Sequence, residues 1–395
     1  MNNIHNKRIW LHSLGCRTNQ SEKESIASGL IEHGAVIENN PQNADAAIIF
    51  TCSVTSTADK KSRQCIRMAR RNIPSGIIVA CGCWAQRLKE DEAKELGIDL
   101  AIGNRQKHLI LGLLEKSFGQ EKTKDNEKSV LHVTEVWNAN NVLWDELPIM
   151  RPVTRSRAFI KIQDGCNRFC SYCIVPFLRG RPVSRPLKHV IGEINNVIAF
   201  GCKEIILTGT NLGDYHCEEG EQTPALSSRP IAGRPEARPI QKVGGISALI
   251  EEIAKIDVKL QFGSIEPFSI NEDFLNAVHK LSCENKFSPP LHVPLQSGDD
   301  VVLARMKRGY TGNEYLSKIK SIRDILGEIP ISTDLIVGFP GETDEAFRNS
   351  VDILKTVGFC KVHVFPYSPR ENTLAAGFED QVPKEIILRR INSLK

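Results

Sequence analysis

Residues 165–173 read Gly-Cys-Asn-Arg-Phe-Cys-Ser-Tyr-Cys and space three cysteines, Cys166, Cys170 and Cys173, as C-x3-C-x2-C. They follow the extended apolar run 158–162, and their spacing fits neither one face of a helix nor one face of a strand. A loop wrapped around a ligand that takes three thiolates is therefore expected. Soft thiolates select zinc, copper(I) or iron–sulfur clusters. A cube of four irons would keep one iron open for a substrate or cofactor, whereas a structural zinc would need a distant fourth Cys or His.

On the C-terminal side of this loop the sequence alternates strands with amphipathic helices. The expected strands are 158–162, 204–207, 260–265, 291–294, 332–337 and 361–365. The expected helices are 187–200, 246–256, 272–281, 300–307, 314–326 and 344–357. Six such units are too few to close an eight-stranded barrel. Polar or glycine-rich stretches at 208–213, 266–267 and 296–298 follow these strands directly, at the edge where parallel sheets bind ligands.

The first 117 residues show the same alternation, with expected strands at 8–13, 46–50, 76–80 and 98–102 and helices at 21–33 and 58–71. This rhythm predicts a parallel sheet covered on both faces. Cys16, Cys52 and Cys83 each follow one of these strands, so three thiolates from separate turns could converge at one sheet edge. The alternative is that they are core residues, because free cysteine is common in protein cores. Cys81 is the alternative to Cys83, but it lies within its strand, and Cys65 is most simply a core residue.

Composition adds limits. The chain has 395 residues, enough for two or three domains, and 51 Lys plus Arg against 47 Asp plus Glu. A net charge of +4 does not by itself indicate a nucleic-acid binder. No run approaches the ~18 apolar residues of a membrane span. We therefore expect no membrane association and a cytoplasmic protein, because thiols stay reduced there.

Three stretches resemble the N-terminal domain of the methylthiotransferases: 14–20 (Leu-Gly-Cys-Arg-Thr-Asn-Gln), 50–55 (Phe-Thr-Cys-Ser-Val-Thr) and 81–86 (Cys-Gly-Cys-Trp-Ala-Gln). The loop at 165–173, with Tyr172 before its last cysteine, resembles the cluster loop of radical S-adenosylmethionine (SAM) enzymes, to which that family belongs. The resemblance implies an α/β fold: an N-terminal parallel-sheet, flavodoxin-like domain followed by an open six-unit (βα) partial TIM barrel.

The same resemblance implies the domain limits. It places a domain that carries an auxiliary cluster at 1–117, a linker with one strand near 130–133 at 118–156, and the radical SAM core at 157–380. A Pro-, Gly- and Arg-rich stretch at 218–245 has the composition of a disordered insertion in that core. Residues 381–395 are expected to be a helical remnant, without the RNA-binding β-barrel in which family members usually end.

Cofactors follow from the resemblance too. Two 4Fe-4S clusters are implied, one on Cys16, Cys52 and Cys83 and one on Cys166, Cys170 and Cys173, with SAM on the open iron of the second. Because SAM supplies the radical, no side chain is expected to be catalytic in its own right. The family pattern places these residues around SAM: Tyr172, Gly209, Thr210, Asn211, Glu266, Gln296 and Asp334.

The implied reaction adds a methylthio group to carbon 2 of N6-threonylcarbamoyladenosine next to the tRNA anticodon, since stretches such as 361–370 most resemble that branch. The alternatives are isopentenyladenosine in tRNA and an aspartate of a ribosomal protein. A non-catalytic RNA chaperone with zinc on both cysteine sets is the alternative from a different class. The expected partners are a tRNA anticodon stem-loop and an electron donor such as flavodoxin or ferredoxin.

Two basic sets also stand out. Arg63, Arg67, Arg70 and Arg71 fit one helix face that is most simply a solvated surface. Arg179, Arg181 and Arg185 follow the cluster loop by a few residues. Because Arg binds phosphate strongly, we expect Arg179 and Arg181 to contact the RNA backbone.

Overall fold

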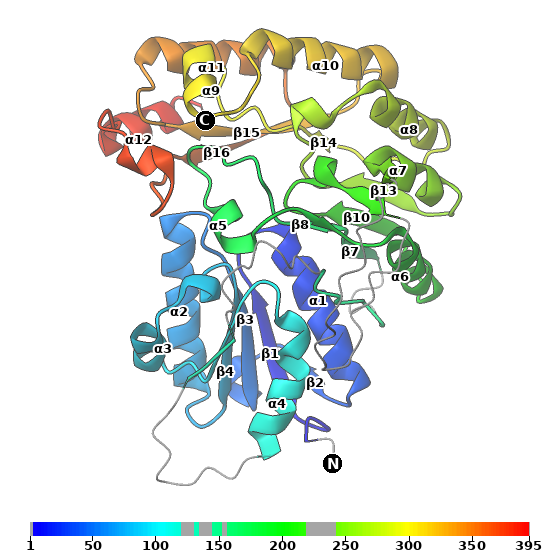
Figure 1. Ribbon diagram of the computed structural model, residues 1–395, viewed down its shortest axis with the longest axis vertical. Coiled ribbons are helices and arrows are strands. Elements are labelled where there is room, and N and C mark those ends of the chain that lie inside the picture. Colours follow the sequence, from blue (N-terminus) through cyan, green and yellow to red (C-terminus); the bar gives the residue numbers. More distant parts are fainter. Residues whose placement is uncertain (1–2, 120–129, 134–143, 152–155, 219–241, 395) are drawn as a thin grey trace, which may run out of the picture.

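The computed structural model describes residues 3–119, 130–133, 144–151, 156–218 and 242–394. It contains a six-stranded parallel sheet at the N-terminal end and an open barrel at the C-terminal end, which lie against each other (Figure 1). Most of the predicted linker and of the predicted insertion at 218–245 lies outside the described residues. The described part of the chain contains no helix that is long and apolar enough to span a membrane.

The N-terminal sheet has the strand order β2-β1-β3-β4-β5-β6, with every pair parallel. Its strands are β1 (Arg8–Ser13), β2 (Val36–Glu38), β3 (Ala46–Thr51), β4 (Ile77–Gly82), β5 (Leu100–Ile102) and β6 (Leu131–Val133). The first five strands follow the flavodoxin-like order 2-1-3-4-5, in which ligands bind where the order reverses, between β1 and β3. β6 is the strand predicted near 130–133, whereas the short β2 had no clear sequence signal.

Helices cover both faces of this sheet. α1 (Arg17–Glu32) and α4 (Ile110–Gly119) pack on one face, with Ile26 and Leu30 of α1 in the core. α2 (Ser56–Asn72) and α3 (Glu90–Leu96) pack on the other, with Ile66 and Ala69 of α2 inward as predicted. α1 begins four residues earlier than the predicted start at residue 21. Its first turn lacks the apolar spacing that would have revealed it.

The barrel is an open sheet of six parallel strands in two three-stranded parts. β13-β10-β7 and β14-β15-β16 are joined by a parallel bridge between Ser264 and His292. The strands are β7 (Arg157–Lys161), β10 (Glu204–Thr208), β13 (Lys259–Phe262), β14 (Leu291–His292), β15 (Ile331–Val337) and β16 (Lys361–Pro366). The outer helices are α6 (Leu187–Ala199), α7 (Ile246–Ala254), α8 (Glu272–Cys283), α9 (Asp300–Arg305), α10 (Gly312–Leu326) and α11 (Asp344–Val357). Six units that do not close confirm the predicted fold class.

Smaller elements complete the barrel. α5 (Val175–Arg179) lies between the barrel and the N-terminal sheet, and α12 (Lys384–Asn392) is the helix expected after residue 380 (Figure 1). Two short antiparallel pairs are β8 (Gln163–Asp164) with β9 (Val183–Ser184), and β11 (His216–Glu218) with β12 (Lys242–Gly245).

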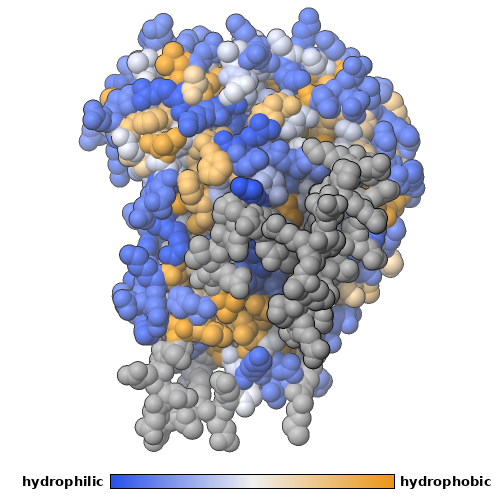
Figure 2. All heavy atoms as spheres, in the orientation of Figure 1, coloured by the Kyte–Doolittle hydropathy of each residue, from blue (hydrophilic) through white to orange (hydrophobic). Residues whose placement is uncertain are grey.

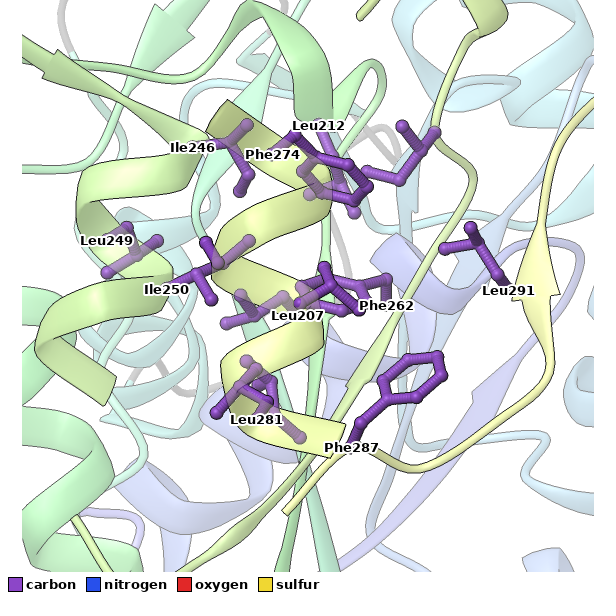
Figure 3. Close-up of a cluster of buried hydrophobic side chains, with 14 of the residues drawn as sticks. Leu207, Leu212, Ile246, Leu249, Ile250, Phe262, Phe274, Leu281, Phe287 and Leu291 are labelled. Carbon is purple, nitrogen blue, oxygen red and sulfur yellow. The ribbon is translucent and has the colours of Figure 1, made fainter. Parts of the chain in front are cut away.

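Apolar side chains from the strands and the outer helices interlock in the barrel core. Phe262 of β13 lies in T-shaped contact with Phe274 of α8, with ring centroids 5.7 Å apart, and Leu207 and Ile250 fill the space beside them (Figure 3). Burying such side chains contributes about 1.5–3 kcal/mol each. This core makes the barrel strands a rigid support for the loops at their carboxyl ends.

Polar residues of α1 fill the contact between the two parts of the molecule. The Ser21 hydroxyl donates to the backbone oxygen of Phe159 in β7, at 2.8 Å. The Arg17 guanidinium donates to the backbone oxygen of Phe262 in β13, at 2.9 Å. On the face shown in Figure 2, the outer edges are mostly hydrophilic and apolar residues gather toward the middle.

Candidate cluster and cofactor site

Three turns at one edge of the N-terminal sheet carry Cys16, Cys52 and Cys83. Cys16 is the N-cap residue of α1, Cys52 directly follows β3, and Cys83 directly follows β4. The three thiols lie close enough for their charges to interact. Cys16 and Cys83 both raise the pKa of Cys52, and Cys16 raises the pKa of Cys83. The structure thus brings together the trio predicted from sequence, beside the point where the strand order reverses.

Close packing holds these turns in place. Gly15 has φ +87°, and a Cβ on it would lie 2.6 Å from the Cys52 Sγ, so a glycine is required where the β1 turn approaches that thiol. The Asn19 side chain donates to the backbone oxygens of Leu14 and Thr51, at 2.6 and 3.0 Å. One buried amide therefore ties the turn after β1 to the turn after β3.

The other cysteines of this domain point into its core. The Cys81 Sγ lies 3.6 Å from the backbone oxygen of Ile49, among the apolar residues under α1. Cys65 lies on the buried face of α2. Cys83, rather than Cys81, is therefore the thiol that the turn after β4 presents to Cys16 and Cys52.

Burial raises the pKa of these thiols, so they stay protonated until a cation binds. Burial raises the pKa of Cys52 to about 12, and the charges of Cys83 and Cys16 add to the effect. Burial also raises the pKa of Cys83, although Arg179 donates a hydrogen bond to it and opposes the shift. A bound metal inverts this preference, because a coordinating thiol loses its proton outright. The trio therefore suits a cationic group such as an iron–sulfur cluster.

The loop between β8 and α5 carries the second trio. The charges of Cys166, Cys170 and Cys173 act on one another in every pairing, and burial raises the pKa of Cys166 to about 11 and that of Cys173 to about 12. The turn into the loop requires Gly165, with φ +77°, because a Cβ there would lie 2.1 Å from the backbone oxygen of Arg181. The three cysteines lie outside any helix or strand, as the spacing predicted.

Within the described residues, one group of Cys, His and acidic side chains brings its ligand atoms within 4.8 Å of one another: His292, Asp334 and His363.

An arginine with no motif signal supports the second trio. Arg308 follows α9, is 6% exposed, and donates to the Cys170 Sγ at 3.7 Å. Its Nη2 forms an ion pair with Glu266, and its Nε donates to the Tyr310 hydroxyl at 3.1 Å. The ion pair aims the guanidinium at a cluster thiolate, where its hydrogen bond favours the charged sulfur. No sequence motif marks Arg308, so its role is visible only from its contacts in the structure.

One cavity joins the two trios. It has a volume of about 690 Å³ and lies between the sheet edge and the barrel. Its lining includes Cys16 and Cys52 from the N-terminal sheet and Cys173 from the cluster loop. Further lining comes from Val54 and Thr55 before α2, from the first turns of α2, and from Ile336 of β15 and Phe365 of β16. Groups bound at the two trios would therefore share one mainly apolar chamber.

The predicted SAM-contacting residues divide into two groups. Tyr172, Gln296 and Asp334 line this cavity. The other four pack beside it. Glu266 is paired with Arg308, the Thr210 hydroxyl donates to Asp164 Oδ1 at 3.2 Å, and the turn at residues 209–211 rests on Gln163. Their contacts support the base of the cluster loop, because Gln163 Nε2 donates to the backbone oxygen of Gly165 at 2.7 Å.

A buried charge network links the trios to the domain contact. Arg179 Nη1 lies 2.9 Å from Asp164 Oδ1 and 3.2 Å from Glu22 Oε1. Lys161 and Lys107 lie 2.9 and 3.2 Å from the two oxygens of Glu22. Their opposing charges hold the pKa of Glu22 down at about 2, although burial alone would raise it. Sequence reasoning missed this network because its members are spread over residues 22–179.

This network corrects one prediction. Arg179 is 4% exposed and committed to carboxylates and to Cys83, so its expected contact with RNA phosphate is wrong. Arg185, in the same set, is buried and paired with Glu146 and Glu193. For Arg179 and Arg185, proximity in sequence to the cluster loop reflects packing beneath the loop. Arg181 is exposed, and its contact with RNA phosphate stays a prediction. In the other set, Arg63, Arg67 and Arg70 pair with acidic residues of α3 and the turn after it.

Comparison with known proteins agrees with this geometry. Residues 8–103 match the family model described as Uncharacterized protein family UPF0004, and residues 160–354 match the Radical SAM superfamily. Threonylcarbamoyladenosine tRNA methylthiotransferase MtaB of Bacillus subtilis is 33% identical over 98% of this chain and 79% of its own length. The tRNA-2-methylthio-N(6)-dimethylallyladenosine synthase of Syntrophus aciditrophicus is 32% identical over 98% and 78%.

The chain belongs to the methylthiotransferase family of radical SAM enzymes. It is a transferase of sulfur-containing groups, and its cofactors are SAM and two 4Fe-4S clusters. These findings confirm the family, enzyme class and cofactors predicted from sequence.

Solved structures agree on the fold. The radical SAM methyltransferase TsrM of Kitasatospora setae superposes with a TM-score of 0.60 at 15% identity, over 94% of this chain and 75% of its own. The cobalamin-dependent SAM radical enzyme OxsB superposes with a TM-score of 0.55 at 12% identity, over 99% and 56%. At these identities the likeness shows the arrangement of a parallel-sheet domain and a partial barrel, and no more.

Proposed function

We propose that this methylthiotransferase acts on tRNA and adds a methylthio group to carbon 2 of N6-threonylcarbamoyladenosine, next to the anticodon. Three relatives at 31–34% identity carry the name threonylcarbamoyladenosine tRNA methylthiotransferase. A tRNA substrate would place the enzyme in the cytoplasm. An electron donor such as flavodoxin or ferredoxin would be needed to reduce the cluster that cleaves SAM.

The observation that carries the proposal is the single cavity between the two trios. We assign the auxiliary cluster, with the sulfur to be transferred, to Cys16, Cys52 and Cys83 in the domain at 1–117. The SAM-binding cluster belongs to Cys166, Cys170 and Cys173 in the core at 157–380. When bound there, SAM supplies the radical that removes hydrogen from an unactivated C–H bond, which no side chain is basic enough to do.

The chain's own residues would bind, orient and shield the reactants. Tyr172, Gln296 and Asp334 line the cavity on the barrel side, and we propose that they contact SAM. The turn at residues 209–211 and Glu266 would act less directly, by holding the cluster loop and Arg308. The apolar lining, which includes Ile336 and Phe365, would keep water away from a radical intermediate.

Isopentenyladenosine in tRNA is the second candidate substrate, because several relatives at 31–32% identity are named as dimethylallyladenosine synthases. The match to the Radical SAM superfamily and the methylthiotransferase relatives favour an enzyme over the zinc-binding chaperone.

The deciding experiment compares modified nucleosides of tRNA from cells with and without the gene, by mass spectrometry. Loss of methylthio-threonylcarbamoyladenosine is expected, with restoration by the wild-type gene and no restoration by Cys52→Ala. Cys65→Ala, on the buried face of α2, is the matched control and should restore the nucleoside. Loss of methylthio-isopentenyladenosine instead would assign the second substrate, and unchanged tRNA would overturn the proposal.

A further inference from the structure

Two histidines and one aspartate meet on three neighbouring strands of the barrel. His292 ends β14, Asp334 lies in β15 and His363 lies in β16. Asp334 and His363 are paired in the parallel register, so their side chains leave the sheet on the same face. One ligand atom from each residue lies within 4.8 Å of the other two. The positions are set by rigid strands rather than by loops, which favours precise ligand placement.

The contacts around the group suit a metal ion. His292 Nε2 lies 3.2 Å from Asp334 Oδ2, while His292 Nδ1 lies 2.9 Å from the Ser332 hydroxyl. Metal-binding histidines usually engage one ring nitrogen with the ion and give the other to a polar partner, which fixes the ring orientation. A simple His–Asp hydrogen bond would account for His292 and Asp334, but not for a second imidazole whose ring centroid is 5.7 Å from the first.

The ligand types narrow the choice of ion. Magnesium and calcium prefer shells made of oxygen, and copper(I) prefers sulfur. Two imidazoles with one carboxylate suit divalent zinc, iron, manganese or cobalt, and three protein ligands leave coordination positions open. All three residues are half-buried, and Asp334 lines the cavity between the two trios, so an open position would lie close to the reactants.

We propose that His292, Asp334 and His363 bind one divalent first-row transition-metal ion, at a site distinct from both cysteine trios. The ion takes Asp334 Oδ2, which leaves the second carboxylate oxygen for the SAM contact assigned to Asp334 above. The site does not depend on which nucleoside is the substrate, because nothing in it involves tRNA.

Manganese(II) is the best probe, since it prefers nitrogen and oxygen ligands and competes poorly for cluster thiolates. The full chain, with both clusters assembled under anaerobic conditions and stripped of loose metal, is titrated with Mn²⁺ while electron paramagnetic resonance follows the free ion. One Mn²⁺ per chain should bind, and electron spin-echo modulation should show coupling to histidine nitrogen. Binding without nitrogen coupling, or no binding, would overturn the proposal.

Variants locate the site. Asp334→Asn keeps the side-chain shape and should weaken Mn²⁺ binding at least tenfold, as should His363→Ala. Ser332→Ala should weaken it about tenfold by freeing the His292 ring. His12→Ala, a half-buried histidine stacked on Trp10 in the N-terminal sheet, is the matched control and should bind like the wild type. Cluster absorbance verifies that each variant is folded, and unchanged affinity in folded Asp334→Asn and His363→Ala would refute the assignment.

Discussion

At the scale of single residues, burial controls the reactivity of the cluster cysteines. The Cys52 thiol is 5% exposed and its pKa is raised to about 12, mainly by burial. Only the thiolate reacts quickly with alkylating agents. In protein prepared without iron, we expect Cys52 to react with iodoacetamide at pH 8 at least tenfold more slowly than the exposed Cys360.

The pH dependence of Cys52 alkylation follows from the same raised pKa. Because the pKa of Cys52 lies well above 8, its thiolate fraction, and so its alkylation rate, should rise about tenfold per pH unit from pH 8 to 10. Peptide mass spectrometry of samples quenched over time measures each cysteine separately. Equal rates for Cys52 and Cys360, or a Cys52 rate independent of pH, would contradict this account of the site. Loading with iron and sulfide should protect Cys52 throughout.

At the scale of elements, the sequence predicted the strands and helices that have regular apolar spacing. The barrel strands and their helices lie within a few residues of their predicted positions, and the cysteine turns follow the strands as expected. The start of α1 was missed because residues 17–20 (Arg-Thr-Asn-Gln) are all polar, so no apolar spacing marks the first turn. The contacts of Arg308 and of the His292 group were missed as well, because contacts between residues far apart in the sequence leave no local pattern.

The segment that holds the cluster loop and α5 also carries exposed aromatic residues. Phe169 and Phe177 are each 49% exposed and touch in a T-shaped pair, with ring centroids 5.7 Å apart. Phe169 has φ +49°, which is uncommon for a bulky residue. Unpaired RNA bases stack on such rings.

We therefore expect the Phe169→Ala, Phe177→Ala double variant to bind an anticodon stem-loop about tenfold more weakly, since stacking of one base contributes ~1–3 kcal/mol. Fluorescence anisotropy of a labelled stem-loop measures the affinity. Phe200→Ala is the control, because Phe200 is 46% exposed but follows α6. Both proteins must carry the full iron content. Equal affinities would show that RNA approaches from another side.

At the scale of the whole molecule, the relative position of the two cluster sites depends on charges buried between the domains. Glu22 of α1 faces Lys107 of its own domain and Lys161 and Arg179 of the barrel part. Glu22→Gln would remove the negative charge that neutralises these three cations in the buried contact between the domains. Breaking a buried ion pair from one side costs about 3 kcal/mol or more. We expect the variant to unfold at clearly lower urea concentration at pH 7, as followed by intrinsic fluorescence of iron-free protein.

The pH dependence separates this charge effect from simple loss of packing. The pKa of Glu22 is about 2 in the folded chain, below its ordinary value of 4.5, so its stabilisation is complete above pH 4.5 and is lost as pH falls toward 2. The stability difference between wild type and Glu22→Gln should therefore shrink steadily over that range. Glu95→Gln, whose side chain is 74% exposed, should show no difference at any pH. A gap for Glu22→Gln that stays constant from pH 7 to 2 would mean that packing, rather than charge, joins the two domains.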